Sequence, residues 1–190
     1  PCWLPLAGDS AEAAAWRAGE GVGGPWAVLA PGAAFGPSKL WEPAAWAAVA
    51  AGLRVRGIEP VLALAQGEEA LGRTIEEAAG GPMPVAMLGL CTLAALIEGA
   101  AVLVGTDAGP RWLAAAVETP TVCLMGPNDP RLTDLPLGTS HEVVRRQIAC
   151  SPCLAKRCGE GHHDCMVGIR AEQVLAAVDR VQEAARPQPL

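Results

Sequence analysis

Short apolar segments alternate with longer segments in which apolar residues recur at helical spacing, from Trp26 almost to the end of the chain. Each apolar segment is brief and is bounded by Gly or Pro, as is typical of strands buried between layers of helices. The alternation predicts an α/β fold, a Rossmann-like parallel sheet with helices on both faces. The expected strands are Trp26–Ala30, Pro60–Ala65, Pro84–Leu88, Ala101–Val104 and Thr121–Met125.

The helical segments carry start and stop signals. Gly57, Gly80 and Gly99 lie where helices should end, because glycine readily adopts the left-handed conformation of a C-cap. Thr92 precedes an apolar periodic run and is expected to cap its start, with ligand binding a lesser alternative. The expected helices are Ser10–Ala18, Pro43–Arg56, Glu68–Ala79, Thr92–Gly99, Pro110–Val117 and Ala171–Ala185.

Composition excludes several classes of protein. The 14 Lys and Arg are outnumbered by 20 Asp and Glu, for a formal net charge of −6, so no basic field would draw the chain to nucleic acid. No apolar run reaches the roughly 18 residues of a transmembrane segment, and no signal-peptide pattern opens the sequence. We therefore expect a cytoplasmic protein.

Two glycine-containing segments join an expected strand to an expected helix. Gly105–Ala116 reads GTDAGPRWLAAA and contains Asp107 and Gly109, and Ala30–Trp41 reads APGAAFGPSKLW and contains Lys39. A helix N-terminus offers unpaired N–H groups and a positive dipole end, and glycine permits close approach of a ligand. Both segments lie at carboxyl ends of strands, where such sheets bind ligands, and both suit a phosphate.

Together these segments resemble the donor-binding motifs of glycosyltransferase family nine, the ADP-heptose–lipopolysaccharide heptosyltransferases, particularly the heptosyltransferase II branch. The resemblance continues through Thr119–Pro130, which reads TPTVCLMGPNDP, and into a cysteine-rich tail, and it covers about Trp26 to Val178. It implies the C-terminal donor-binding half of a two-domain GT-B glycosyltransferase. Because the chain also begins with Pro1 rather than Met, we expect an excised domain.

The resemblance also implies a reaction. An acceptor hydroxyl on the inner core of lipopolysaccharide would attack the anomeric carbon of ADP-heptose with inversion, and ADP would leave. This chemistry needs a base near the acceptor and charge stabilisation at the departing diphosphate, without a cofactor. The family places the base and the acceptor contacts in the N-terminal half, so we expect no catalytic residue here, an inactive isolated domain, and action at the inner face of the inner membrane.

The resemblance assigns donor contacts to both glycine-containing segments. Lys39 would bind the pyrophosphate, with close backbone approach at Gly32 and Ala33, although a lone lysine is more often simply solvated. Asp107 would contact the transferred sugar while the backbone at Gly109 holds the pyrophosphate. As an isolated residue at a strand end, Asp107 could equally be a helix N-cap.

Further donor contacts are expected after the second and third strands. The resemblance places a ribose-binding glutamate at Glu68 or Glu69, with Glu69 preferred, and the adenine near Leu88 and Gly89. Two glutamates that open a helix are equally well explained by the helix dipole.

Two positions depart from the family pattern, which has a hydroxyl residue at 108 and a histidine at 112. This chain has Ala108 and Trp112. The backbone N–H of Ala108 could still bind phosphate. Trp112 could stack on a sugar, but packing against a neighbour is favoured. A non-catalytic or altered-specificity nucleotide-sugar-binding domain is therefore the alternative function. An epimerase fits the motifs less well, and a dehydrogenase would need a glycine fingerprint that is absent from the first turn.

Four cysteines form a second candidate site, with two histidines, His162 and His163, in the last interval. They are Cys150, Cys153, Cys158 and Cys165. Four soft ligands could hold a structural zinc ion, and reduced or disulfide-linked cysteines are the alternatives. Four regions are expected: a linker and helix over 1–25, a nucleotide-sugar-binding domain over 26–140, a cysteine-rich loop over 141–168, and a C-terminal helix and tail over 169–190.

Overall fold

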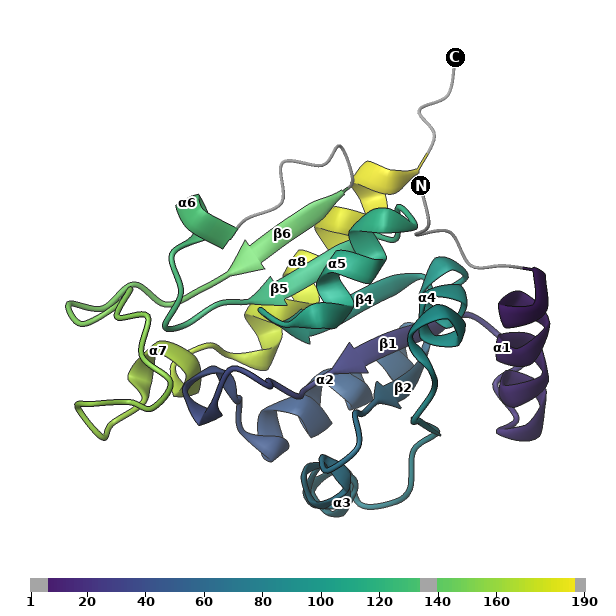
Figure 1. Ribbon diagram of the computed structural model, residues 1–190, viewed down its shortest axis with the longest axis horizontal. Helices are drawn as coiled ribbons and strands as arrows, with labels where there is room; N and C mark the ends of the chain where they lie inside the picture. Colours follow the sequence, from purple (N-terminus) through teal and green to yellow (C-terminus); the bar gives the residue numbers. More distant parts are fainter. Residues whose placement is uncertain (1–6, 134–139, 187–190) are drawn as a thin grey trace.

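The computed structural model describes residues 7–133 and 140–186, which form a three-layer α/β arrangement (Figure 1). Its sheet has six strands in the order β3-β2-β1-β4-β5-β6, and every pairing is parallel. The strands are β1 (Trp26–Ala30), β2 (Glu59–Ala63), β3 (Val85–Ala86), β4 (Val102–Thr106), β5 (Thr121–Leu124) and β6 (His141–Val144). The Rossmann-like parallel sheet predicted from the sequence is confirmed.

Helices cover both faces of the sheet because successive strand residues point to opposite sides and both sides are apolar. One buried cluster joins α2, α3 and α8 to the sheet, and a second joins α1, α4 and α5 to the other face. The helices are α1 (Ala7–Gly19), the 3-10 turn η1 (Pro37–Lys39), α2 (Pro43–Val55), α3 (Glu69–Ala79), α4 (Leu90–Glu98), α5 (Gly109–Ala116), α6 (Pro130–Thr133), α7 (Asp164–Val167) and α8 (Ala171–Ala185). In the described part of the chain, none of them is long and apolar enough to cross a membrane.

The sixth strand was not predicted. His141–Val144 had been assigned to the start of a cysteine-rich loop, but it pairs with β5 in the register Thr121↔His141. The strand is short, lies at the edge of the sheet and begins with two polar residues, so it lacks the apolar run that marked the inner strands. The loop therefore begins only after Val144.

Thr92 does not cap its helix. α4 begins at Leu90 after the N-cap Gly89, and the Thr92 hydroxyl donates a hydrogen bond of 2.9 Å to the Glu12 carboxylate of α1. The prediction was wrong because the helix extends two residues further toward the N-terminus than the apolar pattern indicates. The predicted role of Gly80 as a helix end is confirmed, since Gly80 is the C-cap of α3 and adopts the left-handed conformation at φ 77°.

Candidate functional site

A cavity of about 270 Å³ lies at the carboxyl ends of the inner strands. Most of its lining is Ala, Gly or Leu, and among the described residues the only charged side chain that lines it is that of Glu68. Six of the residues predicted to bind the donor line this cavity: Gly32, Ala33, Glu68, Leu88, Ala108 and Gly109. The sequence therefore located the cavity, although Lys39, Glu69, Gly89, Asp107 and Trp112 lie outside its lining.

The N-terminus of α5 forms one wall of the cavity. Its N-cap is Ala108, which makes no side-chain capping bond, so the alternative in which Asp107 caps the helix is wrong. The N–H of Ala108 donates to the Thr106 carbonyl over 2.8 Å and is already occupied, contrary to expectation. The N–H groups of Gly109 and Arg111 belong to the first turn, where no intrahelical acceptor exists. These groups and the helix dipole favour an anion.

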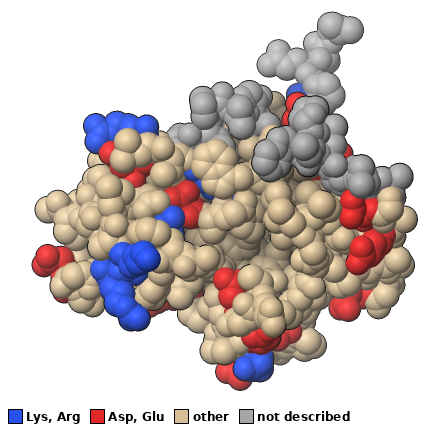
Figure 2. Space-filling model, in the orientation of Figure 1, with Lys and Arg blue, Asp and Glu red and all other residues tan. Residues whose placement is uncertain are grey.

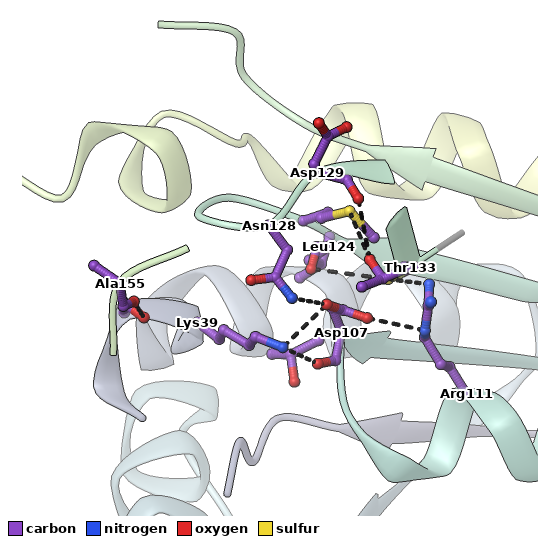
Figure 3. Close-up of polar contacts among 12 residues, drawn as sticks. Lys39, Asp107, Arg111, Leu124, Asn128, Asp129, Thr133 and Ala155 are labelled. Atoms are coloured by element: carbon purple, nitrogen blue, oxygen red, sulfur yellow. Dashed lines mark hydrogen bonds and ion pairs between the residues drawn. The ribbon is translucent and has the colours of Figure 1, made fainter. Parts of the chain in front are cut away.

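Behind this wall, Asp107 is held by three buried side chains (Figure 3). Lys39 Nζ lies 3.0 Å from Asp107 Oδ2 and donates to the Asp107 carbonyl over 2.6 Å. Arg111 Nε lies 3.0 Å from Oδ1, and the Asn128 amide donates to Oδ2. Two cations surround one carboxylate, so this network carries a net positive charge in the interior beside the cavity.

Arg111 is a component that the sequence reasoning missed. Its side chain is 1% exposed, and its Nη1 reaches Cys123 Sγ over 3.5 Å. Within the described residues, Nε and Nη2 have no hydrogen-bond partner, although Nε lies at ion-pair distance from Asp107. The i, i+4 spacing of Asp107 and Arg111 across the helix start is the signal that could have revealed the pair.

Lys39 is not a solvated lysine. It is 7% exposed, and its ammonium points to Asp107 rather than into the cavity. The pyrophosphate role stays a prediction, which requires Lys39 to leave Asp107 when a ligand binds.

Of the two candidate glutamates, Glu68 is the one at the cavity. Its Oε2 accepts the Ala65 N–H over 2.8 Å, and it approaches Gly32 so closely that a Cβ there would lie 1.9 Å from Oε1. Glu69 instead accepts the Gly67 N–H over 3.1 Å, and this bond lowers the pKa of the Glu69 carboxyl. The geometry favours Glu68 for a ribose contact, whereas the sequence had favoured Glu69.

Trp112 and Gly89 border the site without lining it. Trp112 is 48% exposed, and the guanidinium carbon of Arg111 lies 4.8 Å from the centroid of its ring. The packing of Trp112 thus includes its neighbour in sequence, and about half of the side chain stays exposed. Gly89 is the N-cap of α4, beside Leu88, which does line the cavity.

The six cysteines in the described residues are all free thiols, so the disulfide alternative is not what the structure shows. Burial raises the pKa of Cys165, and the thiols of Cys153, Cys150 and Cys158 lie near enough to raise it further. These three thiols therefore lie near Cys165. Within residues 7–133 and 140–186, however, no group of three or more Cys, His, Asp or Glu is arranged to hold a metal ion. The zinc site stays a prediction.

Comparison with known proteins decides the family. The family model of glycosyltransferase family 9 (heptosyltransferase) matches residues 4–163. The chain belongs to this family. Within glycosyltransferase family 9, a lipooligosaccharide heptosyltransferase 2 of Campylobacter jejuni is 28% identical over 153 residues, which cover 77% of this chain and 48% of that protein. The chain thus spans about half the length of the curated relatives it matches.

Solved structures of family 9 share the fold. The structure of Escherichia coli ADP-heptose lipopolysaccharide heptosyltransferase II matches with a TM-score of 0.74 at 24% identity, over 94% of this chain and 52% of the other. E. coli heptosyltransferase WaaC with ADP matches with a TM-score of 0.65 at 22% identity, over 83% and 44%. These likenesses support the prediction that the chain is one Rossmann-like half of a GT-B glycosyltransferase.

Proposed function

We propose that this chain is the donor-binding half of an inverting heptosyltransferase and that its cavity binds ADP-heptose. The whole enzyme would transfer heptose to the inner core of lipopolysaccharide at the cytoplasmic face of the inner membrane. The observation that carries the proposal is the position of the cavity, which lies between Gly32 and the uncapped N-terminus of α5 at Gly109. Membership of family 9 supports the same reaction class.

The polar groups around the cavity are distributed as a nucleoside diphosphate sugar requires. Leu88 and Leu93 supply apolar surface for a base, and the Glu68 carboxylate can accept hydrogen bonds from ribose hydroxyls. The first turn of α5 offers N–H groups to the diphosphate. The uncompensated charge of Lys39 and Arg111 adds electrostatic attraction for the same group.

Departure of ADP requires stabilisation of the charge that develops on the diphosphate oxygen. Lys39 can supply it by exchanging the Asp107 carboxylate for the diphosphate. Asp107 would then lose only its contact with Lys39, while Arg111 and Asn128 keep its carboxylate in place, where it can face the transferred sugar. The general base for the acceptor hydroxyl would come from the other half of the enzyme.

The distribution of charge on the surface agrees with an anionic donor. Figure 2 shows Lys and Arg over α6 and over the loop that precedes α7, whereas Asp and Glu lie chiefly over α1 and α3. Although the whole chain is acidic, Lys156 and Arg157 of this loop lie beside the segment that holds Lys39, since the Lys156 carbonyl accepts from the Ser38 N–H, whereas Arg131 of α6 is paired with Asp129. Such a field favours the approach of a diphosphate.

Calorimetric titration with ADP and with AMP tests the proposal. ADP should bind more tightly than AMP, and Lys39→Ala should weaken ADP binding about tenfold or more while changing AMP binding little, because a charge-assisted contact to the second phosphate is lost. Lys156→Ala is the matched control, since Lys156 is the other lysine of the chain and is exposed, so its loss should weaken ADP binding far less than Lys39→Ala does. Equal affinity for ADP and AMP in the unmodified chain would contradict the proposal.

A non-catalytic or altered-specificity domain is the second candidate, favoured by one observation. Trp112 occupies the position of the expected histidine. It is half exposed and lies outside the cavity lining, so no imidazole faces the donor at this position. Incubation of the full-length enzyme with ADP-heptose and an inner-core acceptor separates the two candidates. Release of ADP with formation of product supports transfer, and saturable binding without release supports the alternative.

A further inference from the structure

The loop that carries the cysteines packs against the segment that carries Lys39. We propose that His163, at the end of this loop, is a positioning residue for Lys39 and thereby for the diphosphate of the donor. The inference rests on the proposed function, because it concerns the same donor site. It adds a residue from outside the cavity that no motif had assigned to donor binding.

Three hydrogen bonds fix Ser38, the residue before Lys39, to the cysteine-rich loop. Ser38 Oγ donates to the Ala155 carbonyl over 2.6 Å, and the Ser38 N–H donates to the Lys156 carbonyl over 3.2 Å. His163 Nε2 lies 2.7 Å from the Ser38 carbonyl oxygen. A carbonyl can only accept, so His163 Nε2 carries the proton and donates. Every polar atom of Ser38 is therefore occupied by the loop.

The bond from His163 has a direct effect on Lys39. The Ser38 carbonyl and the Lys39 N–H belong to one planar peptide unit. His163 holds the carbonyl end of this unit, and the Gly36 carbonyl accepts from the N–H end over 3.3 Å. With both ends bonded, the plane that directs the Lys39 side chain toward Asp107 cannot rotate freely.

The same loop also holds the other partner of Asp107. Ser151 Oγ donates to the Gly126 carbonyl over 2.6 Å, and the N–H groups of Cys153 and Leu154 donate to the Pro127 carbonyl over 3.1 and 2.9 Å. The next residue is Asn128, whose amide donates to Asp107. One loop thus fixes two segments that converge on the same carboxylate from positions far apart in the sequence.

His163 itself adopts an unfavourable backbone conformation. Its φ of 55° and ψ of 22° lie in the left-handed region, which costs energy for a residue other than glycine. The neighbouring His162 offers a comparison within the chain. Its ring contacts Cys150 and Asp164, and among the described residues it has no hydrogen bond to the Lys39 segment.

The test measures ADP affinity of this chain by calorimetry, together with thermal unfolding, for four variants. We expect His163→Ala to weaken ADP binding about fivefold, the worth of one hydrogen bond. His163→Gln retains an N–H donor and the same backbone strain, so it should recover most of that loss. In a Lys39→Ala background, His163→Ala should change ADP affinity less than twofold. His162→Ala should bind ADP as the unmodified chain does.

Several results would overturn the inference. The first is unchanged ADP affinity in His163→Ala. The second is a loss of ADP affinity in His163→Gln as large as the loss in His163→Ala. The third is an undiminished loss of ADP affinity when His163→Ala is made in the Lys39→Ala background, which would show a general structural effect. Absence of ADP binding by the unmodified chain would instead overturn the proposed function and this inference with it. If both variants at His163 fail to fold, nuclear magnetic resonance of the His163 ring in the unmodified chain decides: addition of ADP must shift the ring resonances, because the ring is coupled to Lys39 through the Ser38 carbonyl, and unchanged resonances contradict the inference.

Discussion

Replacement of Asp107 by Asn should separate the stability of the donor site from its affinity for a diphosphate. The substitution removes one negative charge and leaves Lys39 and Arg111 buried without a carboxylate. The buried cluster then carries two positive charges and no negative charge, whereas the unmodified cluster carries a single net positive charge. We expect a large loss of stability but no loss of ADP affinity.

The magnitude follows from the geometry of the two ion pairs. Each joins atoms 3.0 Å apart, and the three side chains involved are 8%, 5% and 1% exposed. At an effective dielectric constant of about 20, the Coulomb energy of each pair is about 5 kcal/mol. Most of this energy only balances the cost of removing the two charges from water. Removing one partner from such a pair costs about 3–5 kcal/mol. Because the Asn carbonyl can still accept from one cation, we expect about 3 kcal/mol.

Urea unfolding and thermal unfolding measure this loss. For a chain of this length, about 3 kcal/mol corresponds to a fall in Tm of about 6–12 °C. Asp179→Asn is the matched control, because Asp179 pairs with Arg56 over 2.8 Å on the surface, where the side chains are 54% and 30% exposed. An exposed pair contributes less than about 1 kcal/mol, so this control should change Tm little.

The second half of the prediction concerns the affinity of the Asp107→Asn variant for ADP. In the Asp107→Asn variant, Lys39 no longer has to leave a carboxylate before it reaches the diphosphate, so ADP should bind as tightly as before or more tightly. The reasoning is refuted if Asp107→Asn lowers stability no more than Asp179→Asn does. It is also refuted if ADP affinity falls in the folded variant, since Asp107 would then support the diphosphate site rather than compete for Lys39.

Two further predictions concern the cysteine-rich region. Gly126→Ala should destabilise the chain by about 1–3 kcal/mol in urea unfolding, because its Cβ would lie 2.5 Å from Sδ of Met166, which is fully buried and cannot move aside. Gly159→Ala, where a Cβ meets nothing within 4 Å, is the control. In reduced, chelator-treated protein, burial raises the pKa of Cys165, so the folded chain retains a proton that the unfolded chain releases. Stability should therefore fall as the pH rises above the ordinary thiol pKa of 9.0, and an equally steep fall in Cys165→Ala would exclude this cause.

The inner sheet and the location of the cavity could be predicted from the sequence because both depend on local patterns. Each inner strand is an apolar run, and Gly32 and Gly109 come two and three residues after the ends of β1 and β4. β6 lacked such a run, since only its last two residues are apolar. The choice between Glu68 and Glu69 depended on a single residue at the start of α3, which a periodic pattern cannot resolve.

The network around Asp107 could not be predicted because its parts come together only in the folded chain. Arg111 lies in a helix whose alanines suggest simple packing, and its i, i+4 spacing from Asp107 indicates a pair but not that the guanidinium is buried. The bond from His163 to Ser38 joins residues 125 positions apart. Contacts of this separation are set by how the strands are ordered in the sheet, which local propensity does not determine.

The small side chains around the cavity limit how its ligand range can change. Its walls at positions such as Ala30, Ala63 and Ala108 are formed largely by backbone and methyl groups, so its outline is set by the spacing of the strands themselves. A substitution at these positions can hardly widen the space, because almost no side-chain atoms remain to be removed. Mutation there can only make the cavity narrower. Room for a bulkier ligand would have to come from shortening a leucine of the lining, which contains Leu64, Leu88, Leu90, Leu93 and Leu113.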